Sequence, residues 1–288
     1  MSSAEPPQSA KSSSSGGSDA AKAQAWSEQT RARPPWLPFA VVASLTVAWQ
    51  VAVVSMRQQA LVPYPVGVAQ AAVRTIEDHS LVTATANSLA RVVIGFGIGA
   101  LLGIPLGVAM GFVRPVGRAL GPIVDSLRSI APIAWIPMAL LWLGIRGNAA
   151  LFIVAYAAFF PFVINAAQGA RLIDRNLVNA ARALGAGRAL VVRAVVLPSA
   201  LPAILTGARI SMAFAWGSII AAELAMGIKV TSGTSGAVGL GQLMVSTLYV
   251  RRDVNALVLY MIVIGVISLC IDLAMRRLQR SLTPWRQA

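Results

Sequence analysis

Long apolar runs without charge alternate with short, charged connections along this chain. Runs of about 20 apolar residues match the length of a helix that crosses a lipid bilayer. In lipid, only a helix satisfies all the backbone groups of one segment internally, so we expect an all-α polytopic membrane protein with six transmembrane helices. The predicted spans cover about residues 37–56, 92–113, 122–143, 149–168, 201–226 and 254–275.

Two of these spans carry patterns of their own. Glycine recurs at every fourth position of the second span, from Gly95 to Gly111. A ridge without side chains lets another helix approach closely, which favours packing inside one subunit over a gating role. The third span is interrupted by Pro132 and Pro137, and near its start Asp125 and Arg128 are spaced to pair on a helix surface.

The first 35 residues differ from the remainder. They are rich in Ser, Gly, Ala and Gln and show no apolar periodicity, so we expect a disordered tail. The tail lacks the short apolar core and cleavage site of a secretory signal, which predicts that it is retained in the cytoplasm. The predicted organisation is a tail over residues 1–35 and a transmembrane domain over residues 36–288.

Composition excludes several classes of function. Hydrophobic residues make up 57% of the chain and charged residues only 12%, against about a quarter in soluble domains. With one Cys and one His, we expect no intrachain disulfide, no metal site and no catalytic constellation. The net charge of +14 comes from arginines at the ends of apolar runs, which is typical of topology determinants, so we expect no nucleic-acid partner.

The arginine distribution predicts orientation. Placing both termini and the segment 171–198 in the cytoplasm puts most Lys and Arg residues inside, although Arg251 and Arg252 oppose the rule. The glycine-rich segment 233–241 then falls outside. It also lacks the lysine of a phosphate-binding loop, so the chain has no nucleotide site of its own.

The segment from Asn179 to Pro198 is basic and amphipathic and reads NAARALGAGRALVVRAVVLP. It predicts a short helix over residues 179–184, a bend at Gly185 and Gly187, and a second helix that Pro198 stops. Two interpretations are open. The segment either docks a soluble partner, with arginines pairing to acidic groups, or rests on lipid headgroups as an interfacial helix.

The spacing of this segment resembles the EAA loop of ABC importer permeases, which docks the ATPase subunit. Further motifs, from Pro63-Tyr-Pro65 to Gly239-Leu-Gly241, resemble the nitrate/sulfonate/taurine-type branch, with a MetI-like fold. One departure is Asn179, which stands where the family usually has an acidic residue, although Asn also caps helices well. The residues assigned to ATPase docking are Asn179, Ala180, Ala181, Arg182, Gly185, Arg188, Leu197 and Pro198.

The resemblance implies a multi-pass protein of the cell inner membrane. It implies two ATPase subunits that bind ATP and Mg, a second permease that is expected to be identical, and a soluble substrate-binding protein. This chain would bind no cofactor itself. It implies a small anionic solute, such as a sulfonate, taurine, nitrate or an organic acid. A secondary transporter is the main alternative, and a membrane enzyme or scaffold fits less well.

Four residues are candidates for lining the solute pathway. Trp135 and Met138 of the third span, with Trp216 and Glu223 of the fifth, are assigned to the pathway. Three roles for Glu223 stay open: closing an outer gate, bonding across a dimer, or bonding to a neighbouring loop. Arg209 is expected to reach the cytoplasmic interface. The residues that could attract an oxyanion are Arg91 and Arg128.

Overall fold

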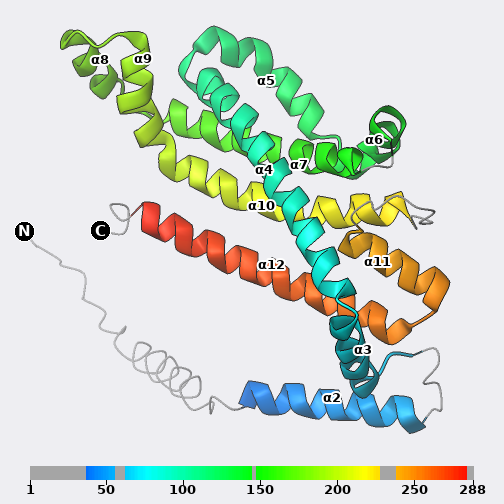
Figure 1. Ribbon diagram of the computed structural model, residues 1–288. Coiled ribbons are helices and arrows are strands. Elements are labelled where there is room, and N and C mark those ends of the chain that lie inside the picture. Colours follow the sequence, from blue (N-terminus) through cyan, green and yellow to red (C-terminus); the bar gives the residue numbers. More distant parts are fainter. Residues whose placement is uncertain (1–36, 56–61, 145–146, 228–237, 284–288) are drawn as a thin grey trace, which may run out of the picture. The chain divides into compact units, whose positions relative to one another are not determined.

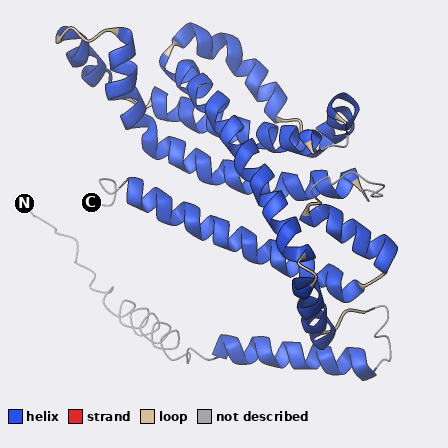
Figure 2. Ribbon diagram, viewed as in Figure 1, coloured by secondary structure: helices blue, strands red, loops and turns tan. Residues whose placement is uncertain are grey.

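The structure is a computed structural model that describes residues 37–55, 62–144, 147–227 and 238–283. Within those ranges every regular element is a helix (Figures 1 and 2). The predicted tail over residues 1–35 and the glycine-rich residues 233–237 lie outside the described residues. The chain divides into two compact units, residues 1–58 and 59–288.

In the first unit, the described element is α2, Leu37–Ser55. It coincides with the first predicted span. The part from Ala43 to Ser55 is apolar but shorter than a membrane crossing, so this span stays a prediction.

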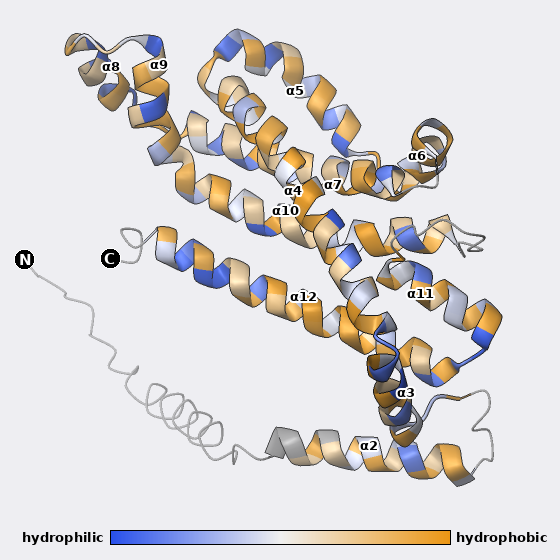
Figure 3. Cartoon of the chain, viewed as in Figure 1, coloured by the Kyte–Doolittle hydropathy of each residue, from blue (hydrophilic) through white to orange (hydrophobic). Residues whose placement is uncertain are grey.

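Four described helices of the second unit are long and apolar enough to cross a membrane, and five if one bent pair is counted as a span. Figure 3 shows hydrophobic residues along most of their length, with hydrophilic residues near the C-terminal end of α12. The four helices are α4 (Ser80–Phe112), α7 (Asn148–Arg171), α10 (Leu197–Met226) and α12 (Val254–Leu282).

The glycine ridge packs α4 against α7, as the spacing predicts. A Cβ atom at Gly99 would lie 2.8 Å from the Cβ of Ala158, and one at Gly107 would lie 2.7 Å from the Cβ of Ala166. These distances are shorter than real Cβ contacts, so the helices approach this closely only because the glycines have no side chains.

The opposite side of α7 packs on α10 by the same means. A Cβ at Gly169 would lie 2.8 Å from the Cβ of Ala203, and one at Gly207 would lie 2.7 Å from the Cβ of Asn165. The hydroxyl of Ser211 donates to the carbonyl of Ala158 at 2.7 Å and satisfies a buried polar group. Small residues on both faces therefore make α7 the central helix of this unit.

The third predicted span is a bent pair. Its first part is α5, Arg114–Arg128, and its second part is a short 3-10 turn, η1 (Pro132–Trp135), that leads into α6 (Ile136–Leu143). The two parts meet at 82°. Pro132 disfavours the helical conformation at the residue before it, and Ala131 there has φ −58° and ψ 137°, which separates α5 from η1.

Two helical regions were missed by the hydropathy pattern. Helix α4 begins at Ser80, well before the predicted boundary at residue 92, because its first turns are mixed in polarity yet still helical. Helix α3, Pro65–Glu77, buries Gly67, Ala71 and Thr75, which recur every fourth residue and form one helix face. It packs on α12, and the backbone N–H of Tyr64 donates to the Oδ1 of Asn255 at 3.1 Å.

Candidate functional site

The segment between α7 and α10 forms a helical hairpin (Figure 1). Helix α8, Arg175–Ala183, is followed by a turn and by the short helix α9, Arg188–Val191. Asp174 caps α8, since its side chain accepts a hydrogen bond from the N–H of Asn176 at 2.8 Å. The expectation that Asn179 caps this helix is therefore wrong: the helix begins earlier, and Asn179 lies in its middle on an exposed surface.

Gly185 makes the turn that ends α8. Its φ is +85°, its N–H donates to the carbonyl of Arg182 at 2.9 Å, and the next N–H, of Ala186, donates to the carbonyl of Ala181 at 3.0 Å. This is the Schellman arrangement, in which the residue after the helix adopts a left-handed conformation that favours glycine. A Cβ at Gly185 would meet open space, so only the backbone conformation restricts this position.

Pro198 does not stop the second helix. A π-helical turn over Val192–Val196 joins α9 to α10, and Arg188 to Met226 form one continuous apolar helical stretch. A proline lacks the N–H of a regular helical bond, and a wider π turn before it is one way that helices accommodate this loss. The hairpin and α10 are therefore joined through one uninterrupted helical stretch.

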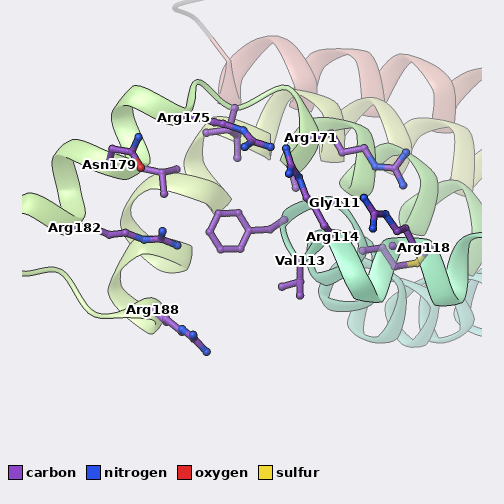
Figure 4. Close-up of a pocket in the computed structure, with 15 residues that line it drawn as sticks. Gly111, Val113, Arg114, Arg118, Arg171, Arg175, Asn179, Arg182 and Arg188 are labelled. Carbon is purple, nitrogen blue, oxygen red and sulfur yellow. The ribbon is translucent and has the colours of Figure 1, made fainter.

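A cavity of about 1170 Å³ lies between this hairpin and the turn that joins α4 to α5. Figure 4 shows arginine side chains entering it from both sides. Among the described residues, none of these arginines forms an ion pair, and no acidic residue lines the cavity. The six arginines are Arg114, Arg118, Arg171, Arg175, Arg182 and Arg188.

The hairpin also exposes apolar side chains. Leu184 is 90% exposed at the tip, and Leu177 is 54% exposed on α8. Along the sequence these two leucines alternate with the arginines of the hairpin. Of the residues assigned to docking, Asn179, Arg182 and Arg188 line the cavity, while Ala180, Leu197 and Pro198 are exposed elsewhere and Ala181 is half-buried.

At the other end of α10, Glu223 is completely buried. Its carboxylate accepts hydrogen bonds from the hydroxyl of Ser88 at 2.8 and 2.9 Å, from the Nη1 of Arg91 at 2.7 Å and from the N–H of Gly241 at 3.0 Å. Glu223 therefore bonds to α4 and to the first turn of the segment that follows α10, while closing an outer gate and bonding across a dimer stay predictions. The structure also assigns Arg91 to a partner inside the chain.

This carboxylate explains the two glycines at the N-terminus of α11, Leu240–Ser246. A Cβ at Gly239 would overlap the carboxylate of Glu223, and one at Gly241 would lie 2.8 Å from its Cβ. The backbone comes this close because neither residue has a side chain, and Ser88 completes the contact by accepting from the N–H of Leu240 at 2.9 Å.

Arg209 pairs with an acidic residue of α12, and its expected place at the cytoplasmic interface stays a prediction. Its Nε lies 2.8 Å from the Oδ1 of Asp272 on α12, and Arg276 contacts the other oxygen of the same carboxylate at 2.8 Å. An acceptor on the adjacent helix therefore holds this guanidinium in place. The three remaining pathway residues differ in exposure: Trp216 is buried, Trp135 is half-buried beside Tyr156, and Met138 is exposed.

The model of the family described as "Binding-protein-dependent transport system inner membrane component" matches residues 82–285. The chain belongs to this family. The permease is 33% identical to the taurine transport system permease protein TauC of Escherichia coli, over 84% of this chain and 86% of that protein. It is 38% identical to the bicarbonate transport system permease protein CmpB of Synechococcus elongatus, over 70% of each chain.

A solved structure of the inward-facing MetNI methionine ABC transporter has the same fold. A chain of it aligns to the permease with a TM-score of 0.59 and 25% identity, covering 70% of this chain and 96% of that one. The predicted family and the predicted function, a membrane permease subunit of an ABC importer, are confirmed. The secondary-transporter alternative no longer stands.

Sequence reasoning missed part of the arginine cavity in this permease. Arg114, Arg118, Arg171 and Arg175 were interpreted as topology determinants only, yet they converge with Arg182 and Arg188 on one cavity. The available signal was topological: the turn after the second predicted span and the segment 171–198 were placed on the same side of the membrane. Arginines from these two segments can therefore lie close together on that side of the bundle.

Proposed function

We propose that the α8–α9 hairpin is the element by which this permease binds a separate ATPase subunit. The observation that supports the proposal most directly is the cavity of six arginines, with no acidic residue among those that line it, beside the exposed tip at Leu184. The relatives are permease components of transport systems, and this chain shows no phosphate-binding loop of its own.

Uncompensated positive charge fits an acidic partner surface. Six guanidinium groups around one cavity repel one another, and a carboxylate-bearing surface relieves that repulsion and forms bidentate hydrogen bonds. Complementary charge also speeds encounter and sets the orientation of the complex. Leu177 and Leu184 would contribute the apolar part of the contact, as buried leucines do at interface centres.

In this proposal the hairpin transmits movement of the ATPase to α10. Gly185 holds α8 and α9 in a fixed turn, and α9 continues into α10 through the π turn. Helix α10 is about 45 Å long at 1.5 Å per residue, and its far end carries Glu223. A movement of the ATPase against the hairpin would therefore reach the Glu223 network through one helix and favour one of two pathway states.

The proposal extends to topology and assembly. With α2 and the bent α5–α6 pair each counted as a span, the permease has six crossings, both termini in the cytoplasm and the hairpin on the same side. A second copy of the chain would complete the pathway, with two ATPases that bind ATP and Mg below it and a soluble binding protein outside. The exposed apolar face of α10 that includes Ile210 and Phe214 is available for that pathway.

The proposed solute is a small anion that carries an oxyanion group. The relatives are permeases for taurine, whose acidic group is a sulfonate, and for bicarbonate. Both solutes present negatively charged oxygens in a small volume. We therefore propose the class of solute, a small molecule with negatively charged oxygens, and no single compound.

Charge reversal tests the docking proposal. The tagged permease is expressed with its ATPase and purified in mild detergent, and the bound ATPase is quantified. We expect the double variant Arg182→Glu/Arg188→Glu to retain at most about a tenth of the wild-type ATPase, since opposed charges become like charges. Arg277→Glu, a similar change at an exposed position on α12, is the control and should retain it. Equal recovery from all three proteins would refute the proposal.

A further inference from the structure

A second cavity, of about 250 Å³, lies at the break of the bent α5–α6 pair. It is lined by Arg128 at the end of α5, by Tyr156 and Asn165 of α7, and by Ile210 and Phe214 of α10. Broken helices in the membrane are where transporters place their solutes, because the break exposes groups that a regular helix satisfies internally. None of the four residues assigned to the pathway from the sequence lines this cavity, but Arg128, named there as a residue that could attract an oxyanion, does.

Arg128 is the only charged residue among those described that line the cavity. Its Nε lies 2.9 Å from the Oδ1 of Asp125, and its side chain is 51% exposed. This pair, expected from the spacing, is confirmed. Its terminal nitrogens form no hydrogen bond or ion pair with any other described residue, and Asp125 does not line the cavity. An exposed pair of this kind is weak, so an arriving anion competes with Asp125 for the guanidinium.

A hydrogen bond from α7 holds the end of α5, beside Arg128. The hydroxyl of Tyr156 donates to the carbonyl of Leu127 at 2.7 Å and ties the end of α5 to α7. Tyr156 also packs edge-on against Phe160, with ring centroids 4.9 Å apart. Apart from Arg128 and Asn165, the residues that line the cavity are aromatic or aliphatic, which is the usual composition of a small-molecule site with a few placed polar groups.

Helix α7 lacks one backbone donor at the cavity. Pro161 lies inside the helix and has no N–H, so the regular helical bond to the carbonyl of Ala157 is missing. Ala157 and Pro161 both line the cavity. The proline therefore interrupts the regular hydrogen bonding of α7 at the cavity, and the Nδ2 of Asn165 donates to the carbonyl of Pro161 at 2.8 Å.

We infer that this cavity is a solute subsite of the permease, in which Arg128 binds the oxyanion group of a small sulfonate or carboxylate. The inference rests on the proposed function, since it requires that the chain form the solute pathway. It assigns specificity to Arg128 and the walls of α7 and α10, and it gives Asp125 the role of a competing anion that lowers the affinity of the site.

Cysteine accessibility tests the subsite without depending on transport. In a Cys270→Ser background, Ile210→Cys places one thiol in the cavity, and Leu184→Cys places one at the hairpin tip as the control. The full-length permease in mild detergent is treated with an anionic methanethiosulfonate that carries an ethylsulfonate and with its cationic trimethylammonium analogue. The ratio of the two reaction rates reports the local preference for anions.

Opposite effects are expected from the two halves of the pair. A positive charge about 7 Å from the thiol, in water, raises the local concentration of the anionic reagent about threefold and lowers that of the cationic reagent about threefold. A negative charge at the same distance has the opposite effect. Arg128→Gln should therefore lower the anionic-to-cationic ratio at residue 210 about sevenfold, and Asp125→Asn should raise it. Neither should change the ratio at residue 184. Ethanesulfonate at millimolar concentration should slow modification in the wild-type background and have no effect in Arg128→Gln.

Three outcomes would overturn the subsite: no reaction of the thiol at residue 210 with either reagent, an unchanged ratio in Arg128→Gln, or a shift in the same direction from both variants. The last result would mean that the pair has only a structural role. None of these readouts requires the ATPase, so failure of the subsite is distinct from failure of the docking proposal, which the charge-reversal experiment tests.

Discussion

Arg91 lies 2.7 Å from the buried carboxylate of Glu223, and this contact joins the middle of α4 to the far end of α10. Glu223 is completely buried and Arg91 is 14% exposed, whereas Asp125 and Arg128 are 65% and 51% exposed. The two pairs have similar geometry in very different surroundings. Their contributions to stability should differ accordingly.

Removing one partner of the buried pair should destabilise the fold strongly. We expect Arg91→Gln to lower the free energy of unfolding by about 3 kcal/mol or more, because Glu223 stays buried without its main charge partner. Asp125→Asn, which breaks the exposed pair, should cost about 1 kcal/mol or less. Thermal unfolding of the detergent-solubilised permease measures both. An equal loss of unfolding free energy in both variants would show that burial does not determine how much these ion pairs stabilise the fold.

The glycine ridge predicts a second contrast. Gly107→Ala should destabilise the permease by about 1–3 kcal/mol, because the new methyl group overlaps Ala166 and the carbonyl of Val163. Gly97→Ala lies on the same helix with nothing within 4 Å of its Cβ. It should be neutral or stabilising by up to about 1 kcal/mol, since alanine favours helices. The unfolding midpoint should therefore fall in Gly107→Ala and stay unchanged or rise in Gly97→Ala, and a loss at Gly97 would contradict the packing described.

Gly185 predicts a graded effect on transport. Gly185→Val should distort the turn, because a left-handed conformation costs about 1–2 kcal/mol and a β-branched residue tolerates it least. Gly185→Asn should retain most activity, since Asn enters this conformation more readily. The measurement is solute uptake alongside the unfolding midpoint. Wild-type uptake in Gly185→Val would mean that the turn does not matter for coupling.

Asn179 offers a test of the charge environment. Arg175 and Arg182 stand four residues before it and three after it, on one face of α8. Asn179→Glu restores the acidic residue usual in the family and should pair with both arginines, adding about 0.2–0.5 kcal/mol per pair. The gain in unfolding midpoint should appear at low salt and fade at high salt. An unchanged midpoint at low salt would show that these guanidinium groups do not reach residue 179.

The sequence predicted the features that depend on single residues and their spacing. The spacing of Gly95 to Gly111 predicted a packing ridge, and Pro132 with Pro137 predicted a break. Both depend on properties of the residues themselves, namely a missing side chain and a missing N–H. The family followed from the order of motifs, which belongs to the sequence alone.

Pairings between distant residues were not predictable in this way. Arg209 meets Asp272 across 63 positions, and Glu223 meets Ser88 across 135. No periodicity encodes such a contact. The cap at Asp174 and the π turn before Pro198 were missed for another reason. Several neighbouring residues compete to end or extend a helix, and tertiary packing decides between them.

Docking of the ATPase at the hairpin is the central claim, and cross-linking at Leu184 tests it most directly. A photoreactive amino acid at position 184, where the side chain is 90% exposed, is activated in membranes that contain the assembled importer. The same substitution at Leu269, 59% exposed on α12, is the control. We predict an adduct with the mass of permease plus ATPase from position 184 and none from position 269. An ATPase that copurifies yet forms no adduct with position 184 would place the docking site elsewhere on the permease.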